Sequence, residues 1–333
     1  MRGSGTDGAL DPRLHPGRGR HARRVQALQV VLGAIWLLDG ALQFQPYMFT
    51  KGFVSNVIAP SADGNASFVS HPTLSVAHLM MPDVATWNAL FATIQVLLGI
   101  GIIVGALMRR TPLLRLALAG SFLWSAAVWW LAEGLGGVLT GASPLAGAPG
   151  AVALYVVAGI LLWPGDDFPA PLLGSRFARA VWGTLWALSA FLLLEPPNQG
   201  RGAVSSVISA ASAGEPAPVH TMLSSVADSL KSAGPWLDSL LALVMLAVGA
   251  AVALRLLERA ALATSVVLAV AIWIFGEAFG GILSGQATDP NSGPLWVLLA
   301  LCMWVGLDKE AVSSTPDGAV DGALPPDLLI QLR

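Results

Sequence analysis

Long apolar runs, separated by polar stretches, divide the chain in a regular order. The first run covers residues 25–44, and its roughly 20 residues are enough to cross the hydrocarbon core of a bilayer. We predict eight transmembrane helices, at residues 25–44, 87–107, 116–132, 151–163, 180–194, 236–256, 262–276 and 295–307. The predicted fold class is therefore an all-α, polytopic integral membrane protein.

The remaining stretches are too polar to span a membrane. Residues 45–84 and 195–234 contain short apolar bursts, which predict helices lying at the membrane surface. Residues 1–24 and 308–333 have no periodic apolar face, and we predict that they are disordered tails. Residues 166–179 form a polar connector between the two halves of the chain.

The two halves align with each other, which predicts a tandem duplication. An offset of 150 residues pairs Trp36 with Trp186, and V-S-N-V-I-A at 54–59 with V-S-S-V-I-S at 204–209. Farther along, an offset of 144 residues pairs the remaining spans. A match of this length with so few gaps is very improbable by chance, so the repeat defines two four-helix membrane modules.

The modules, residues 25–165 and 180–307, must enter the bilayer in the same direction because each has an even number of spans. Of the 18 Lys and Arg residues, 15 lie in the tails, the short basic turns and the connector. Only Lys51, Arg201 and Lys231 lie in the alternate loops. The positive-inside rule then predicts a multi-pass protein of the cell membrane with both termini cytoplasmic.

One motif, W-x3-E-x2-G-G-[VI]-L-[ST]-G, occurs at residues 129–141 and again at 273–285. Its acidic residues, Glu133 and Glu277, end long apolar runs, where an unpaired carboxylate is costly. Two interpretations stay open: a protonatable pair for a proton relay, or two carboxylates that fix helix packing. The glycine pairs favour close packing under either one. They are Gly136, Gly137, Gly280 and Gly281.

On a helix, Trp129, Glu133, Gly137 and Gly141 fall four residues apart, so we predict that they line one face. This face is a carboxylate in a groove of small residues, with a tryptophan one turn before it. Trp129 and its counterpart Trp273 are thus candidate binding residues beside the two carboxylates.

Further polar residues interrupt the apolar runs of the first module. Asp39 lies in the first span, Gln43 follows it one turn later, and Gln95 lies in the second span. Asp39 is not duplicated, because its counterpart is Ser189. We interpret these residues as candidates for ligand binding or proton relay, with hydrogen bonding between helices as the alternative.

Composition excludes several classes of protein. Charged residues make up 11% of the chain, against about 25% for soluble domains. The formal charge is −2, which gives no support for a nucleic-acid partner. One cysteine rules out an intramolecular disulfide and a multi-cysteine metal site. His71 and His78 are weak copper candidates, since imidazole suits that metal, but loop packing explains them better.

The segments G-A-I-W-L-L-D-G-A-L-Q-F, at 33–44, and Q-V-L-L-G-I-G-I-I-V-G-A-L-M-R-R-T-P-L-L-R-L-A-L, at 95–118, resemble the opening helices of DoxX/DoxD-type membrane proteins. That family has four helices, the size of one module here. It often has Lys where this chain has Gln43, and an acidic residue in place of Gln95. The resemblance implies a small subunit of a quinone-linked or other redox membrane complex.

These observations leave three functional hypotheses. The first is a subunit of a redox or envelope-associated complex that binds a quinone-like lipophilic molecule and a membrane partner protein. The second is a proton-coupled solute transporter or channel that uses Glu133 and Glu277. The third is a non-catalytic scaffold. No phosphate loop, nucleophile elbow or haem-attachment motif occurs, so the sequence does not indicate an enzyme acting alone.

Overall fold

A computed structural model describes residues 16–166 and 170–313, and every regular element in these ranges is helical. The α-helices are α1 (Pro16–Leu42), α2 (Lys51–Phe53), α3 (Ser67–Met80), α4 (Val84–Leu107), α5 (Thr111–Leu131), α6 (Ala151–Leu161), α7 (Arg176–Leu193), α8 (Ala203–Ala211), α9 (Ala217–Leu230), α10 (Trp236–Ala253), α11 (Glu258–Ala271) and α12 (Ser292–Ser313). Short 3₁₀ or π segments join them: η1 (Pro46–Phe49), η2 (Val54–Ile58), η3 (Ala59–Ala62), η4 (Gly134–Thr140), η5 (Pro144–Ala146), η6 (Pro196–Asn198), η7 (Ile272–Gly276) and η8 (Ala278–Ser284).

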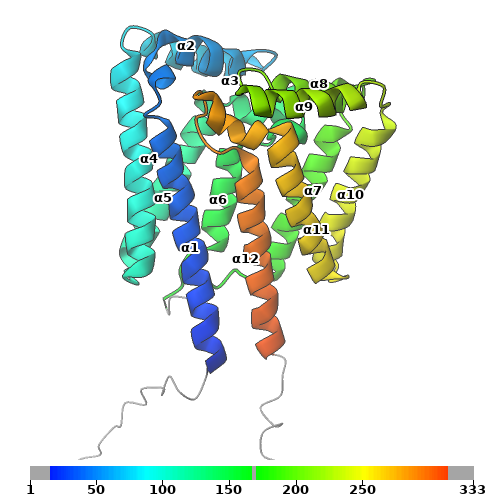
Figure 1. The fold of residues 1–333 in the computed structure, drawn as a ribbon. Helices are drawn as coiled ribbons and strands as arrows, with labels where there is room; N and C mark the ends of the chain where they lie inside the picture. Colours follow the sequence, from blue (N-terminus) through cyan, green and yellow to red (C-terminus); the bar gives the residue numbers. More distant parts are fainter. Residues whose placement is uncertain (1–15, 167–169, 314–333) are drawn as a thin grey trace, which may run out of the picture.

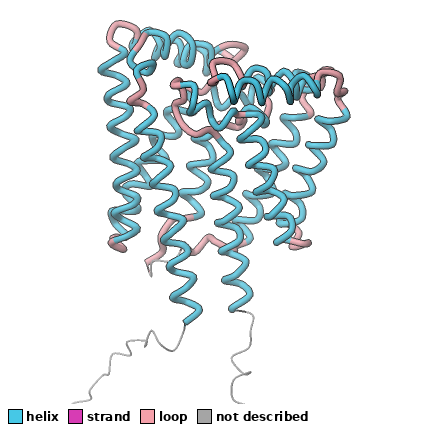
Figure 2. The backbone as a smooth tube through the Cα atoms, in the orientation of Figure 1, coloured by secondary structure: helices cyan, strands magenta, loops and turns pink. Residues whose placement is uncertain are grey.

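Long upright helices form a bundle, and short helices lie across one of its ends (Figure 1). Five helical segments are long and apolar enough to cross a membrane: Gly19–Leu42, Val84–Leu107, Thr111–Leu131, Trp236–Ala253 and Glu258–Gly276. Helices α6, α7 and α12 run beside them (Figure 1). Loops gather at the two ends of the bundle (Figure 2). The first described residue of α1 and the last of α12 lie at the end opposite the short helices (Figure 1).

The two halves repeat one packing order. Helix α1 packs on α4, α4 on α5 and α5 on α6, while α7 packs on α10, α10 on α11 and α11 on α12. Glycines allow α1 and α4 to approach closely: a Cβ on Gly33 would lie 2.9 Å from the Gly99 carbonyl oxygen. Helix α12 also contacts α1 and α6, so it joins the two halves.

Short apolar segments cover one end of the first half. Phe53, Val54 and Ile58 pack with Ala77 and Met80 in a cluster of buried side chains. Helix α3, with α2 and η2, therefore forms a cap over the ends of α4 and α5. The predicted helices at the polar stretch 45–84 are thus present in the structure.

Helices α1 and α12 extend farther than the sequence pattern predicted. Residues 16–24 and 308–313 are helical, so the tail predictions are wrong for these residues, while residues 1–15 and 314–333 lie outside the described ranges. Arg24 forms an ion pair with Asp308, which joins the two extensions. Helical hydrogen bonds are local and need no apolar face, so the absence of periodicity did not mark the helix ends.

The repeated motif does not continue its helix, which corrects the prediction of one face lined at four-residue spacing. Leu135, Gly136 and Gly137 have φ values of 58°, 61° and 69°, in the left-handed region. Phe279, Gly280 and Gly281 repeat these values at 58°, 72° and 66°. The glycine pairs therefore permit a left-handed turn instead of close helix packing, because glycine adopts positive φ without a steric penalty.

Each turn packs against the loop that follows it. A Cβ on Gly136 would lie 1.8 Å from the Pro149 carbonyl oxygen, and one on Gly280 would lie 2.4 Å from that of Pro290. The same two carbonyl oxygens accept hydrogen bonds from the indole N–H groups of Trp129 and Trp273, each at 2.8 Å. In each half, the tryptophan and the glycine of the motif thus hold the equivalent loop in place.

Candidate functional site

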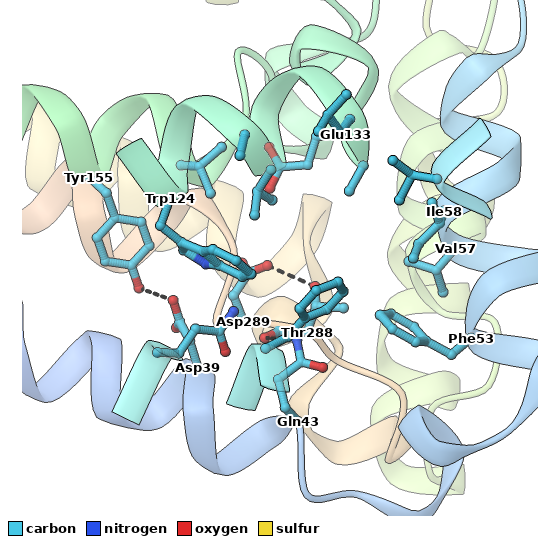
Figure 3. Close-up of a pocket in the computed structure, with 18 of the residues that line it drawn as sticks. Asp39, Gln43, Phe53, Val57, Ile58, Trp124, Glu133, Tyr155, Thr288 and Asp289 are labelled. Atoms are coloured by element: carbon cyan, nitrogen blue, oxygen red, sulfur yellow. Dashed lines mark hydrogen bonds between the residues drawn. The ribbon is translucent and has the colours of Figure 1, made fainter. Parts of the chain in front are cut away.

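A cavity of about 170 Å³ lies in the first half, between α1, α4, α5 and α6, with the cap on its outer side. Figure 3 shows the labelled side chains surrounding this space. The polar residues that line it are Asp39, Gln43, Gln95, Glu133, Thr288 and Asp289. The aromatic residues that line it are Trp36, Phe53, Phe91, Trp124 and Tyr155.

Asp39 is the most deeply buried carboxylate of the cavity, with 2% of the residue exposed. Its Oδ2 accepts a hydrogen bond of 2.6 Å from the Tyr155 hydroxyl (Figure 3). Its Oδ1 has no hydrogen-bond partner among the described residues. Trp36, one turn earlier on α1, stacks on Tyr155 with ring centroids 4.2 Å apart. Packing and hydrogen bonding together hold Tyr155 against Asp39.

Two glutamines leave hydrogen-bonding capacity in the cavity. Gln43 and Gln95 are buried, with 4% and 8% of each residue exposed. The Oε1 atom of each has no partner in the part of the chain that the structure describes. The indole N–H of Trp124 is likewise buried without a partner there. Because buried polar groups are normally hydrogen-bonded, these atoms mark where a ligand or water would bind.

Glu133 reaches the cavity from the end of α5 (Figure 3). Its Oε2 is buried and has no hydrogen-bond partner within the described ranges. Burial raises the pKa of this carboxyl to about 8, and the charge of Asp289 acts in the same direction. Glu133 thus changes its protonation near neutral pH, which suits a group that takes up and releases protons.

Asp289 comes from the other half of the chain, in the loop between η8 and α12. Its Oδ2 accepts from the Thr288 hydroxyl at 2.8 Å, and its Oδ1 accepts from the Asn291 N–H at 2.7 Å. Burial raises the pKa of this carboxyl as well. The sequence pattern did not identify Asp289, because the loop residues showed only turn chemistry and no apolar run pointed to a buried position.

The charged side chains in the described lining of the cavity are all acidic. Asp39, Glu133 and Asp289 line it, and no Lys, Arg or His is among the described lining residues. Ionised carboxylates in such a place repel each other and lose hydration, so they need protons or a bound cation. The arrangement can therefore exchange protons for a positively charged group.

Glu277 has a different environment from its counterpart Glu133. Its carboxylate accepts hydrogen bonds from the Ser292 hydroxyl and, at 3.0 Å, from the Gly293 N–H, at the start of α12. Burial raises its pKa to about 7, and these hydrogen bonds oppose that rise. The shared tryptophan bonds to Pro149 and Pro290 set an offset of 141 residues here, so Ser292 corresponds to Ala151.

The second half also replaces the polar lining of the cavity. The counterparts follow from the offsets of 150, 144 and 141 residues. Asp39, Gln43 and Gln95 correspond to Ser189, Leu193 and Met245, while Trp124 corresponds to Leu268 and Tyr155 to Trp296. There the indoles of Trp186 and Trp296 pack with centroids 4.6 Å apart. The acidic lining therefore belongs to the cavity of the first half and is not repeated in the second.

The structure brings together four of the candidate residues from the sequence: Asp39, Gln43, Gln95 and Glu133. Trp129, Trp273 and Glu277 lie outside the lining and hold the repeated loops instead. His71 and His78 are exposed on α3. Among the described residues, no group of three or more His, Cys, Asp or Glu side chains is placed to hold a metal ion.

Comparisons with protein-family models, curated proteins and solved structures find no match to this chain. The geometry of the cavity therefore carries the functional argument.

The raised pKa of Glu133 predicts pH-dependent stability. Between pH 4.5, the ordinary pKa of a glutamate, and pH 8, the folded protein keeps a proton that the unfolded chain has released. Stability should therefore fall as pH rises through this window. In detergent, the thermal unfolding midpoint of Glu133→Gln should depend less on pH than that of the parent. The difference should be clearest between pH 7 and 8, above the pKa of Glu277.

Asp228→Asn is the matched control for this measurement, because Asp228 is an exposed carboxylate paired with Lys231 on α9. In this variant the unfolding midpoint should change with pH as it does in the parent. If the midpoint of Glu133→Gln also changes with pH as in the parent, Glu133 is ionised alike in the folded and unfolded states.

Proposed function

We propose that the protein is an eight-span integral membrane protein, built as two parallel four-helix modules with both termini in the cytoplasm. Five helices have the length and apolarity of spans, and α6, α7 and α12 run beside them. The repeated packing order and the repeated left-handed turns support the duplication. The described ends of α1 and α12 lie on one side, as an even number of spans requires (Figure 1).

We further infer that this protein is a proton-coupled transporter of a small solute. The observation that carries this proposal is the cavity in which Asp39, Glu133 and Asp289 meet without a basic side chain in the lining. Membrane carboxylates in such settings commonly mark proton or ion pathways. The pair formed by Glu133 and Asp39 suits this role better than the pair Glu133 and Glu277, because Ser292 and Gly293 already satisfy Glu277.

This proposal assigns a separate role to each side chain of the site. Glu133, with a pKa near 8, releases its proton as the solute enters and regains it as the solute leaves. Asp39 binds the polar part of the solute, and Tyr155 orients that carboxylate through its hydroxyl. The cap formed by α2, η2 and α3 limits access of water to the site.

Proton movement in proteoliposomes tests the transport proposal. Vesicles loaded with a pH-sensitive dye receive a panel of small cationic, zwitterionic and neutral solutes under an imposed pH gradient. At least one solute should accelerate decay of the gradient. Asp39→Asn and Glu133→Gln should each slow that decay at least about tenfold, the effect of losing roughly 1.4 kcal/mol of interaction.

Ser189→Ala provides the matched control. Ser189 occupies the position of Asp39 in the second half, and its hydroxyl donates to the carbonyl oxygen of Leu185, in its own helix, at 3.0 Å. This variant should transport like the parent. If no solute in the panel moves protons, or if Asp39→Asn transports like the parent, the proposal of proton-coupled transport fails.

A quinone-binding subunit of a redox complex is the second candidate. The buried indole N–H groups of Trp36 and Trp124 lack partners among the described residues, and a quinone carbonyl oxygen would accept a hydrogen bond from either. The resemblance of the first module to DoxX/DoxD-type proteins motivates the same proposal. Native mass spectrometry and an absorption spectrum on protein extracted in its own lipids would detect a bound quinone, and its absence would leave transport as the better proposal.

A further inference from the structure

The chemistry of the cavity also specifies its ligand. Asp39 is 2% exposed, and its Oδ1 is buried without a partner among the described residues. The Oε1 atoms of Gln43 and Gln95 are also buried without a hydrogen-bond partner among these residues. Asp39 Oδ1 and the two Oε1 atoms are acceptors, so the groups that can satisfy these three atoms are hydrogen-bond donors or positive charges.

The walls of the cavity are aromatic. Phe91 lies edge-on to Trp124 at a centroid distance of 5.3 Å, and Trp36 stacks with Tyr155, whose hydroxyl donates to Asp39. Aromatic faces attract a cation through their quadrupole, and this attraction strengthens when the cation is desolvated. An acidic group surrounded by aromatic rings is therefore suited to an organic cation with apolar substituents.

Other ligand classes fit less well. An inorganic metal ion needs converging ligands, and none are grouped for it among the described residues. An anion would meet three carboxyl groups and no basic side chain in the described lining. A neutral molecule would give the carboxyl groups of Asp39 and Asp289 no positive charge to pair with when they ionise.

The volume limits the size of the ligand. The cavity measures about 170 Å³. An engineered apolar cavity of about 150 Å³ in another protein accommodates benzene. A single aromatic ring, or a comparable group that carries one ammonium, therefore fits the space.

We propose that this cavity binds a small organic monocation, an amine or quaternary ammonium about the size of one aromatic ring, with Asp39 as its counter-ion. The proposal rests on the proposed transport function, since it names the ligand class of the same site. It predicts one cation per chain, because the second half has Ser189 and Trp296 in place of Asp39 and Tyr155.

Calorimetry on the full chain in nanodiscs tests the proposal with two probes of the same shape. The cationic probe is cyclohexylammonium, which keeps its proton from pH 6 to pH 9, and its neutral isostere is cyclohexanol. Empty nanodiscs provide the correction for lipid partitioning. At pH 8 the cation should bind at a 1:1 ratio and at least tenfold more tightly than the isostere.

The pH dependence gives an additional readout. The titratable groups that face Glu133 in the lining are Asp39, Asp289 and Tyr155. Cation affinity should increase as pH rises from 6 to 9, because Glu133, with its pKa raised to about 8, loses its proton over this range. Binding of the neutral isostere should not increase.

Two variants separate the acidic and aromatic contributions. Asp39→Asn should weaken cation binding at least tenfold, and Trp124→Leu, which introduces the residue of the second half, should weaken it severalfold. Ser189→Ala should bind like the parent. Trp124→Leu keeps the test decisive if Asp39→Asn does not fold.

The outcomes distinguish this inference from the transport proposal. Equal affinity for the two probes, or unchanged cation affinity in both site variants, would overturn the cation site. Specific cation binding without proton movement in vesicles would sustain the cation site and remove the transport function. Solute-driven proton movement without cation binding would sustain transport and remove the cation site.

Discussion

Replacing Gly136 with alanine should destabilise the protein by at least about 3 kcal/mol, combining left-handed strain with overpacking. Gly136 has a φ of 61°, and a Cβ there would lie 1.8 Å from the Pro149 carbonyl oxygen. That oxygen also accepts the Trp129 indole hydrogen bond, so the loop cannot move away without breaking this bond. Equilibrium unfolding in mixed detergent micelles would measure the loss.

Gly281→Ala is the control for this prediction. Gly281 has a similar φ of 66°, but the nearest atom to a Cβ there is 3.8 Å away. Its substitution should cost only the conformational strain of about 1–2 kcal/mol. An equal loss of stability in the two variants would mean that the contact with Pro149 is not the reason for the large effect at Gly136.

Removing Arg179 should give the second large effect. Arg179 on α7 is 3% exposed and forms ion pairs of 2.8 Å with Glu258 of α11 and Glu310 of α12. It also donates to the Gly174 carbonyl oxygen at 2.9 Å. Breaking a buried ion pair by deleting one partner costs about 3–5 kcal/mol, and partial exposure of the two glutamates places Arg179→Met near the lower value.

Arg115→Met tests whether burial is the cause. Arg115 pairs with Asp166 at 2.8 Å, but the side chain of Asp166 is 95% exposed. Exposed ion pairs contribute about 0–1 kcal/mol, so this variant should lose little stability in the same unfolding measurement. A loss as large as that of Arg179→Met would contradict the assigned role of the buried cluster.

The sequence predicted the helical fold and its five membrane-length helices because an apolar run of about 20 residues suits a helix that crosses a bilayer. Asp39, Gln95 and Glu133 stood out as polar residues in such runs, and the structure brings them to one cavity. Asp289 and Tyr155 did not stand out. Tyr155 lies in an apolar run where its hydroxyl needs no special signal, and Asp289 reaches the site through the path of a loop, which periodicity does not describe.

The left-handed turn shows a second limit of sequence patterns. Adjacent glycines at 136 and 137 are compatible with close helix packing and with positive φ, and the sequence alone does not separate these choices. The deciding contact is with Pro149, which lies farther along the chain. Because that contact depends on tertiary structure, the four-residue spacing from Trp129 led to the wrong face.

The two halves use one repeated structural arrangement differently. The tryptophan bond to a proline carbonyl and the left-handed turn occur in both. The buried acid at the motif is bonded to Ser292 in one half and left without a partner at Oε2 in the other. The geometry is shared, while the substitutions around it separate a supporting half from a half with an acidic cavity.

Asp289 is contributed by the second half to the cavity of the first. A cation that settles between Asp289 and Asp39 would be attracted at once to the loop before α12 and to α1. Any sliding of these helices past each other would alter the separation of the two charges. Occupancy of the cavity by a cation would therefore favour one relative position of the two halves.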